Sequence, residues 1–593
     1  MSSTRQVLNQ FLELRSFSEP LHSVLLGATP GTVSLPPRSK VPKFMNAVDP
    51  PRSSATNSGE GRDVRSKGPL HARSTATKRP ASRRSASRRR RWGRRVLLTV
   101  VAAAVLLAGG AIADYYYLGS LIHRTTVHHL QKTTSTENIL LVGSTDRCAL
   151  KVQNKAYGLC SQGVTGINGD IVMVLHLNLT THAVSLISLP RDTFVPNART
   201  TGANKIDAAL YQGPSQLAVA IEEDFAIPIS HYVELNFDTF ASVVNVLGGI
   251  NMYFPMEIFD AYSQLNIRHT GCLHLDGFHA LQVVRARHLQ IRYKGLSQIH
   301  STWPQEGLSD LARIRRDHEF LKVLASALKA RGLSNPITDQ RLATAVAPYL
   351  TVDSSFSTGH MLSLAEKFSS VSIGNVPELT MPVVLVQTGS YLYQGYYYGE
   401  VEFPLQPGIS SVVHQFLGLN SSTNTLDGRP LPRANAVTVS VVNGTGVTNQ
   451  AASVAAQLGA HGFRMSAEST AVPFGPRSET VVYHANNSPA SIGAAQAVLR
   501  DIEGPAVMAL GPTTGSSEVT VRTGSDILIA PVHRASTSTT RSKHPSSKST
   551  TTTTVVDPSS VKSDPSLSAP TAVTQALQPW DPRSCGPNNT PGP

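Results

Sequence analysis

The chain has 593 residues, of which 16% are charged, and its formal net charge at pH 7 is +14. The excess is confined to the first 95 residues, which carry 20 Lys and Arg against 5 Asp and Glu, so the rest of the chain is nearly neutral. This distribution excludes a basic nucleic-acid-binding surface spread over the fold. Four cysteines in a chain of this length also exclude a disulfide-dense scaffold.

The N-terminal part of the chain predicts a tail followed by a membrane anchor. Residues 1–95 are rich in Ser, Arg and Pro and poor in large apolar side chains, so we expect a disordered basic tail. The run from Val96 to Ala113 is apolar and uncharged, and as a helix it would span about 27 Å, close to the hydrocarbon thickness of a bilayer. The arginines that end at Arg95 place the tail in the cytoplasm and the later residues outside the cell.

A cleaved export signal is the alternative interpretation of the same segment. The tripeptide Ala111-Ile112-Ala113 resembles a small-residue cleavage site, and Arg94-Arg95 faintly resembles a twin-arginine signal. The length of the preceding tail favours a retained single-pass anchor. Both interpretations export the remainder of the chain to an oxidising compartment.

Beyond the anchor, short apolar runs alternate with helical patterns. Strands are predicted over 138–142, 171–177, 183–189 and 232–236. Helices are predicted over 214–225, 237–247, 276–284 and 308–331. This mixture predicts an α/β fold, in which residues 137–420 form an α-β-α sandwich with a largely buried sheet.

A second, smaller domain is predicted after a Pro-containing linker. Within residues 436–530, strand and helix patterns follow the order βαββαβ, which is that of the split ferredoxin-like α+β arrangement. Ser, Thr and Pro dominate residues 535–593, for which we expect a disordered tail.

Acidic and arginine residues stand at the ends of the predicted strands. Asp146 follows the first strand, Asp170 opens the second, and Arg191-Asp192 closes the third. Loops at the carboxyl ends of strands gather at one crevice of an α/β sheet. Two carboxylates there would suit a hard cation such as Mg²⁺.

Further arginines come from two helical segments. Arg285 and Arg287 project the same way if the backbone between them is extended, and Asp310, Arg313 and Arg316 share one helix face. Several arginines beside carboxylates in a nearly neutral domain match a pyrophosphate site, because guanidinium groups bind phosphate oxygens in pairs. Surface ion pairing, such as that of Asp310 with Arg313, is the alternative that spacing leaves open.

The cysteines indicate one short disulfide loop. Cys148 and Cys160 bracket a short segment and are expected to pair in an oxidising compartment. Cys272 and Cys585 are then left over.

Seven sequence blocks resemble, in their order, those of the LytR-CpsA-Psr (LCP) family. The series begins with NILLVGSTDR (138–147), includes SLPRDTFV (188–195) and LDGFHALQVVRAR (275–287), and ends with DLARIRRDHEFL (310–321). The small domain, with VVNGTG and its Ala-rich helix, resembles the LytR C-terminal domain.

This resemblance implies a function and a set of site residues. The family transfers wall glycopolymers from an undecaprenyl-pyrophosphate carrier to peptidoglycan, with Mg²⁺, and pyrophosphatase activity is a further expectation. By motif, Asp146 and Asp170 would hold the metal. The general base is left open, since Asp192 would either take the acceptor proton or merely orient Arg191. The arginines expected to bind the pyrophosphate and act in catalysis are Arg191, Arg285, Arg287 and Arg313, with Arg316 as a further phosphate contact.

Two positions depart from the family pattern. Asn168 replaces an arginine two residues before the second metal aspartate, and Asp317 replaces a glutamine after the second helical arginine. An insertion that contains both Cys148 and Cys160 also separates the two aspartates.

The lipid tail of such a donor requires an apolar tunnel. We expect it among residues that would otherwise be ordinary core, namely Val233, Phe237, Phe240, Val243, Val244 and Leu247.

A non-catalytic wall-polymer-binding or regulatory protein is the alternative function. Asp146 and Asp170 argue against this non-catalytic function, because carboxylates repel an anionic polymer unless a metal lies between them. The expected partners are the lipid-linked glycopolymer, peptidoglycan and the membrane, and no nucleic acid is expected.

Overall fold

The structure is a computed structural model that describes the following residues of the chain. They are 113–114, 116–131, 135–146, 148, 159–163, 165–307, 309–332, 343–385, 391–466, 479–531 and 576–586. The chain divides into a unit of residues 1–87 and a unit of residues 88–593, and all described residues belong to the second. The predicted tail and the predicted membrane span, except Ala113, lie outside the described residues. No helix within the described part is long and apolar enough to cross a membrane.

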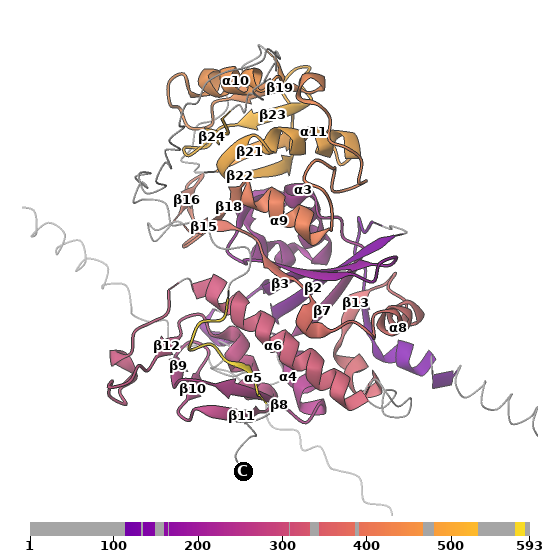
Figure 1. Ribbon diagram of the computed structural model, residues 1–593, viewed down its shortest axis with the longest axis vertical. Coiled ribbons are helices and arrows are strands. Elements are labelled where there is room, and N and C mark those ends of the chain that lie inside the picture. The colour runs from indigo at the N-terminus through magenta and orange to yellow at the C-terminus, as the bar shows by residue number, and fades with distance from the viewer. Residues whose placement is uncertain are drawn as a thin grey trace, which may run out of the picture. The chain divides into compact units, whose positions relative to one another are not determined.

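A seven-stranded mixed sheet forms the centre of the first domain (Figure 1). Its strands, in spatial order, are β1 (His123–Thr125), β13 (Thr351–Asp353), β7 (His231–Asn236), β2 (Thr136–Asp146), β3 (Ile167–Asn178), β4 (Val184–Leu189) and β14 (Glu378–Thr380). Strand β2 is parallel to β7 and antiparallel to β3, which is antiparallel to β4. The carboxyl ends of β2, β4 and β7 therefore share one edge with the amino end of β3.

Both faces of this sheet are buried. In β2, Leu140 and Val142 belong to one core cluster, whereas Ile139 and Leu141 belong to the cluster on the opposite face. Successive side chains of a strand point to opposite faces, so a strand that is covered on both sides needs apolar residues at consecutive positions. The run ILLV meets this requirement.

Helices cover the two faces, as predicted for an α-β-α sandwich. One face packs against α3 (Pro214–Phe225) and α9 (Gly408–Phe416). The other carries α4 (Phe237–Val246), α5 (Gly277–Arg285), α6 (Ser309–Gly332) and α8 (Thr358–Lys367). The mixed α/β architecture of the first domain is thus confirmed.

Short sheets surround this core at positions that the pattern did not predict. Two of them have two strands each: β5 (Phe194–Arg199) pairs with β6 (Gly202–Lys205), and β16 (Leu392–Tyr393) pairs with β17 (Tyr396–Tyr397). A three-stranded sheet contains β9 (Ile258–Asp260), β10 (Leu265–Ile267) and β12 (Gln290–Ile291). Another contains β8 (Ile250–Phe254), β11 (Gly271–Leu275) and β25 (Arg583–Ser584).

A second sheet of eight strands forms the C-terminal part. Its strands are β15 (Val383–Leu385), β18 (Glu402–Gln406), β22 (Ile502–Leu510), β21 (Thr480–His484), β23 (Val519–Arg522), β19 (Thr438–Val442) and β20 (Arg464–Met465) in spatial order, with β24 (Leu528–Ile529) paired to β22. The helices of this part are α10 (Gln450–Ala460) and α11 (Pro489–Leu499).

The predicted split ferredoxin-like arrangement of this domain is wrong, although the element order βαββαβ does occur. Strand β23 lies between β19 and β21, parallel to the first and antiparallel to the second. Strand β23 thereby forms backbone hydrogen bonds with β19 on one side and with β21 on the other, and so joins the pair β19-β20 to the pair β21-β22. The pattern analysis did not assign a strand to these four residues.

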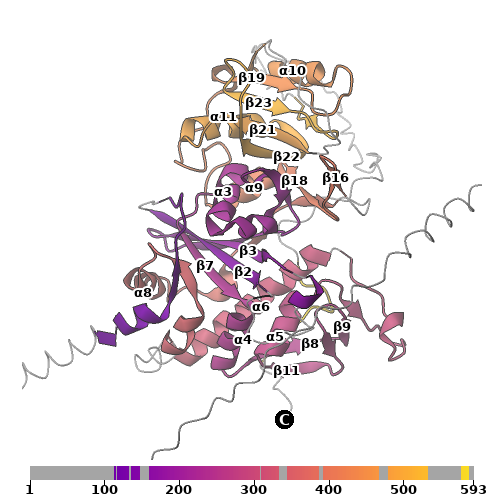
Figure 2. The same ribbon diagram turned by 180° about the vertical axis from the view of Figure 1, so that it is seen from behind.

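The two domains share a sheet and a buried interface. Strand β18, which precedes the predicted boundary near residue 420, pairs with β22 of the C-terminal domain. Asn487 Nδ2 donates to Glu223 Oε1 on α3 at 2.9 Å, and Val481 and Val507 join the core cluster of the first domain. Figure 2 shows α3 and α9 between the central sheet and the second sheet.

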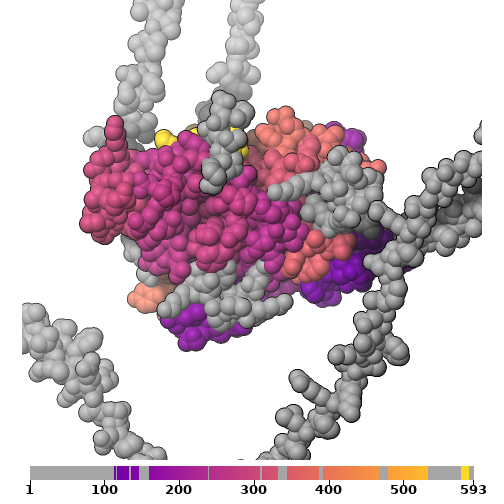
Figure 3. Space-filling model, turned by 90° about the horizontal axis from the view of Figure 1, so that it is seen from below, coloured from indigo at the N-terminus to yellow at the C-terminus, as the bar shows by residue number. Residues whose placement is uncertain are grey.

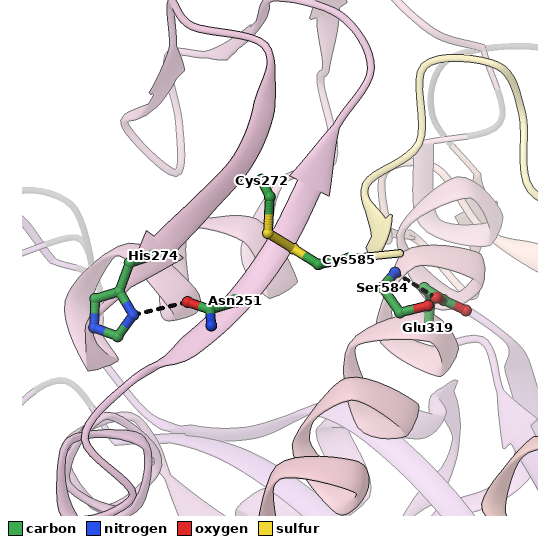
Figure 4. The surroundings of a disulfide bond; sticks show 6 residues. All are labelled: Asn251, Cys272, His274, Glu319, Ser584 and Cys585. Carbon is green, nitrogen blue, oxygen red and sulfur yellow. Dashed lines mark hydrogen bonds between the residues drawn. A yellow bond between two sulfur atoms is a disulfide. The ribbon is translucent and has the colours of Figure 1, made fainter. Parts of the chain in front are cut away.

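The C-terminal segment 576–586 returns to the first domain, which corrects the prediction of disorder throughout 535–593. Its strand β25 pairs with β8, and a disulfide joins Cys585 to Cys272 on β11 (Figure 4). These two cysteines were expected to be left over. Ser584 N donates to Glu319 Oε1 on α6 at 2.8 Å. In the space-filling view, the yellow residues of the segment lie against the magenta surface (Figure 3).

A second disulfide joins Cys148 and Cys160, the two cysteines that were expected to pair.

A buried ion-pair network fixes the same segment. Asp581 is fully buried, and its carboxylate lies 2.5 Å from Arg315 Nε. Arg315 also pairs with Glu306 at 2.5 Å, and Glu306 accepts from Trp580 Nε1 at 2.9 Å. Composition concealed this contact, because a Ser/Thr/Pro-rich stretch gives no periodic pattern from which docking of its last residues can be predicted.

We expect Asp581→Asn to destabilise the protein by about 3 kcal/mol, because removing one partner of a buried ion pair leaves the other charge poorly compensated. The free energy of unfolding, measured by urea titration without reductant, tests this. Asp427→Asn is the matched control, since Asp427 pairs with the exposed Arg429 and its loss should cost under about 0.5 kcal/mol. Equal losses in the two variants would contradict the stabilising role of Asp581.

Candidate functional site

A cavity of about 330 Å³ lies between the central sheet and helices α4, α5 and α6. Its apolar wall includes Leu141 and Val233 from the sheet and Phe240, Phe320 and Leu324 from the helices. Its polar lining includes two carboxylates and four arginines, namely Asp170, Asp317, Arg191, Arg285, Arg287 and Arg313.

Arg191 lies just beyond the carboxyl end of β4, where the sheet brings it beside β3. Its guanidinium group forms an ion pair with Asp170. Its backbone N–H donates to Asp310 Oδ2 at 3.2 Å, and Asp207 lies 4.0 Å from its Nε. Burial alone would lower the pKa of Arg191, but Asp170 and three further aspartates raise it, so the group stays charged.

Arg285 and Arg287 both line the cavity because the chain becomes extended where α5 ends. Asp260 Oδ2 accepts from Arg287 N at 2.8 Å, and Ala286 has an extended ψ of 117°. The spacing of two residues therefore directs both guanidinium groups to the same side. Arg285 Cζ also lies 4.7 Å from the centroid of the Phe237 ring, a cation–π contact. Neither Asp260 nor its role was predicted.

Gly277 allows α5 to approach α4 closely enough to place these arginines. A Cβ atom at this position would lie only 2.0 Å from the carbonyl oxygen of Ala241 on α4. The backbone N–H of Gly277 also donates to Asn245 Oδ1 at 2.8 Å. The glycine of the block LDGFHAL is thus required by helix–helix contact.

Arg313 reaches the site from the buried face of α6. Its Nη2 donates to the backbone oxygen of Asp170 at 2.7 Å and also pairs with Asp310 at 2.7 Å. The ion pair between Asp310 and Arg313, which the spacing left open as a surface contact, therefore does form, but both side chains are buried beside the cavity.

Arg316 does not belong to the site, and the prediction that it binds phosphate is wrong. Its side chain is 1% exposed, pairs with Glu306 and donates to the backbone oxygen of Ala286 at 2.7 Å. Arg316 lies about 60° around the helix from Arg313, just beyond the side that lines the cavity, and its contacts with Glu306 and Ala286 keep its guanidinium group out of the lining. Its contacts instead hold the chain just after α5.

Asp192 is buried beside the cavity and does not line it. It accepts from Lys205 Nζ at 2.8 Å and from Arg287 Nη2 at 2.5 Å. Burial would raise the pKa of Asp192, but Arg191, Arg287 and Lys205 hold it well below its usual range. This geometry favours the orienting role over that of a general base. Lys205 was not singled out, although it lies in NKIDAAL (204–210), another of the seven blocks that resemble the family.

Three further carboxylic acids near the arginines are shifted towards their neutral forms. Burial raises the pKa of Asp317 to about 8, although Arg313 and Arg316 act in the opposite direction. Burial also raises the pKa of Asp207 to about 7 and that of Glu402 well above its ordinary value. Asp317 and Glu402 thus leave arginine charge available for a bound anion at neutral pH.

The second predicted metal ligand is only partly described. Asp146 ends β2 opposite Ile167 of β3, at the edge that also holds Asp170. The side chain of Asp146 lies outside the described residues. Its pairing with Asp170 therefore stays a prediction.

The predicted tunnel residues divide into two sets. Val233, Phe237 and Phe240 line the cavity, whereas Val243, Val244 and Leu247 are buried without lining it. Val244 belongs to the core cluster that includes strand β8 and helix α5, which explains why the second half of α4 contributes nothing to the cavity. The lining that pattern analysis did not predict includes five residues of α5 and α6, namely Leu281, Val284, Phe320, Leu321 and Leu324, and residues of the sheet such as Leu141 and Met173.

Two protein-family profiles match the chain. The LytR_cpsA_psr family matches residues 118–404. The LytR cell envelope-related transcriptional attenuator family matches residues 436–526.

Individual relatives match over part of their length. Probable cell wall biosynthesis protein LcpB of Corynebacterium glutamicum is 32% identical over 236 residues, which cover 39% of this chain and 52% of that protein. The Bacillus subtilis polyisoprenyl-teichoic acid–peptidoglycan teichoic acid transferase TagV is 27% identical over 267 residues, which cover 43% and 61% of the two chains. The chain thus spans between half and two thirds of these relatives. A solved LytR-Csp2A-Psr enzyme from Actinomyces oris is 24% identical, with a TM-score of 0.36 over 44% of this chain and 87% of that chain.

Asp317→Asn should flatten the pH dependence of stability between about pH 4 and pH 8. The folded state raises the pKa of Asp317 from 3.8 to about 8, so its contribution is complete below the lower value and is lost as the pH rises through the higher one. Asparagine resembles the protonated acid but does not titrate. The stability difference between variant and parent should grow by up to about 1.4 kcal/mol per pH unit in this window.

The measurement is the free energy of unfolding from urea titrations at several pH values. Glu366→Gln, at an exposed position of α8, is the control and should follow the parent. A profile of Asp317→Asn that runs parallel to that of the parent would contradict the raised pKa.

Proposed function

Since the chain belongs to the LytR-CpsA-Psr family, we propose that it transfers a glycopolymer from an undecaprenyl-pyrophosphate carrier to peptidoglycan. The observation that carries the proposal is the cavity in which an apolar interior opens beside Asp170 and four arginines. The names of the relatives LcpB and TagV, which refer to cell wall biosynthesis and teichoic acid transfer, support it. Both ends of a lipid pyrophosphate, the apolar tail and the anionic head, are matched by this lining.

The arginines supply what phosphoryl transfer requires, which is positioning and charge neutralisation. In the proposed step, an acceptor hydroxyl oxygen attacks the phosphorus that carries the glycopolymer. A new P–O bond forms, the bridging P–O bond breaks, and lipid monophosphate leaves, its phosphate taking up the proton that the hydroxyl releases. The pyrophosphate oxygens that gain charge would accept hydrogen bonds from Arg191, Arg285 and Arg287. Arg313 would hold the backbone of Asp170 in place.

The residues of the site fit Mg²⁺. Asp170 is a nearly buried carboxylate at the cavity wall, and carboxylate oxygens are the donors that this hard cation prefers. Asp146, at the same edge of the sheet, would be the second ligand. The cation would neutralise pyrophosphate charge when bound.

The apolar segment 96–113 would anchor the chain in the cell membrane, with the N-terminus in the cytoplasm and both domains outside. An anchored enzyme would meet its lipid-linked donor within the plane of the membrane. This topology supports a carrier lipid as donor and peptidoglycan as acceptor.

Arg285→Lys separates a transferase from a binding protein. Lysine keeps the charge but loses the fork that binds two phosphate oxygens, so turnover should fall on the order of 100-fold, and more than donor affinity does. The assay measures release of lipid phosphate from a lipid-pyrophosphate glycan with Mg²⁺ and peptidoglycan. Arg429→Lys, at an exposed residue of the linker, is the matched control. If the parent binds the donor tightly but releases no lipid phosphate, the transferase proposal fails and the binding-protein alternative replaces it.

Leu324→Trp tests whether the cavity holds the lipid tail. The larger side chain would fill part of the cavity, so affinity for a long-chain polyprenyl donor should fall more than affinity for a short-chain analogue. Leu362→Trp, at an exposed position of α8, is the control. Equal losses for long and short donors would place the tail elsewhere.

A further inference from the structure

A second cluster of polar side chains lies at the other end of the central strands. It consists of Glu137 at the start of β2, His231 at the start of β7, and His360 on α8. One potential ligand atom from each of them lies within 4.8 Å of the other two. We propose that these three residues bind a divalent transition-metal ion of the zinc class, at a site separate from the arginine-lined cavity.

The sheet register explains why the three residues meet. Ile139 of β2 lies opposite His231 of β7, and Glu137 shares the face of Ile139 because side chains alternate along a strand. Helix α8 covers this face and contributes Leu364 to its core cluster. Its first turn, capped by Ser357, places His360 over Glu137.

The separations suit a metal site. Glu137 Oε1 and Oε2 lie 2.9 and 3.0 Å from His360 Nε2, and Oε2 lies 3.9 Å from His231 Nε2. In a tetrahedral zinc site with bonds of about 2.1 Å, ligand atoms are about 3.4 Å apart. The observed separations lie on either side of this value, so modest side-chain rotations would admit the ion.

His231 is oriented as metal-binding histidines usually are. Its Nδ1 lies 3.1 Å from Asp353 Oδ2, and since a carboxylate only accepts hydrogen bonds, Nδ1 carries the proton. Asp353 is itself held by the backbone N–H groups of Tyr232 at 3.0 Å and Ser355 at 2.9 Å. Phe356 stacks on the imidazole ring, with centroids 4.1 Å apart.

This arrangement turns Nε2 of His231 towards the Glu137 carboxylate, 3.9 Å away. Where Nε2 carries no proton, two hydrogen-bond acceptors face each other, which is favourable only when a cation lies between them. The side chains of Glu137 and His231 are 8% and 12% exposed, whereas that of His360 is 39% exposed. An ion can therefore enter from the side of α8.

The ligand set determines which metal is expected. Two imidazole nitrogens and one carboxylate suit Zn²⁺, whereas Mg²⁺ prefers oxygen ligands alone. Glu137 also precedes Asp146 by nine positions on β2, which corresponds to about 30 Å of extended strand. A zinc ion here would tie α8 to the two strands without reaching the arginine-lined cavity.

Zinc binding by the full-length chain tests the proposal. The chain is stripped with a chelator, dialysed against Zn²⁺ in excess Mg²⁺, and analysed for metal by mass spectrometry. The parent should retain about one zinc more per chain than His360→Ala or Glu137→Gln. Asp353→Asn, which removes the partner of His231, should weaken zinc binding by about 10–100-fold.

The matched controls are His279→Ala and Asp170→Ala. His279 is an exposed histidine that pairs with Asp276 at 2.7 Å, and Asp170 belongs to the other site, so both variants should keep the zinc. Strong visible absorption of the Co²⁺-loaded chain, which reports a low-coordinate, near-tetrahedral ion, should be lost in His360→Ala. Since His360 is partly exposed on a surface helix, this variant should keep the circular dichroism spectrum of the parent. Equal zinc content in the parent and His360→Ala would overturn the proposal and leave the Glu137–His360 contact as an ion pair.

Discussion

Mutual neutralisation of buried arginines and aspartates is the interaction on which the site of this protein depends. Asp192 contacts Lys205 and Arg287, and Asp310 contacts Arg287 and Arg313, so each carboxylate ties together side chains from different elements. Charges removed from water are costly unless they are paired. The loop after β4, the chain after α5, and α6 must therefore keep their relative positions, because a displaced element would leave a buried charge without its partner.

The same neutralisation must remain incomplete for an anion to bind. If every nearby carboxylic acid were ionised, the arginines would have little charge left for the pyrophosphate ligand that we propose. Burial resolves this conflict by favouring the neutral forms of Asp317 and Glu402. The aspartates in close contact with arginines orient them, while the acids that burial shifts towards their neutral forms leave the site positive. The resemblance to the family leads us to expect a glutamine at the position of Asp317, and the neutral acid is uncharged as that amide would be.

Helix α6 carries cations on two sides and links the cavity to the C-terminal segment. Arg313 faces the cavity, whereas Arg315 and Arg316 face Glu306 and the buried Asp581. The Cys272–Cys585 disulfide and the β8–β25 pairing hold Asp581 in place. Residues near the end of the chain thus support the helix that supplies one of the arginines of the site.

Local sequence by itself determined strands β2, β3, β4 and β7 and helices α3 to α6, because helix and strand patterns depend on neighbours in the chain. Pro214 and the apolar spacing predicted α3 from 214 to 225. Strand ends singled out Asp170 and Arg191, two helical segments singled out Arg285, Arg287 and Arg313, and all five residues line the cavity. Only the tertiary structure decided the contacts between distant segments. The insertion of β23 depends on hydrogen bonds to two separate strand pairs, and Cys272 meets Cys585 across 313 residues. Whether an arginine of α6 faces ligand or core depends on what packs against each side of the helix, and periodicity along one segment carries no information about that neighbour.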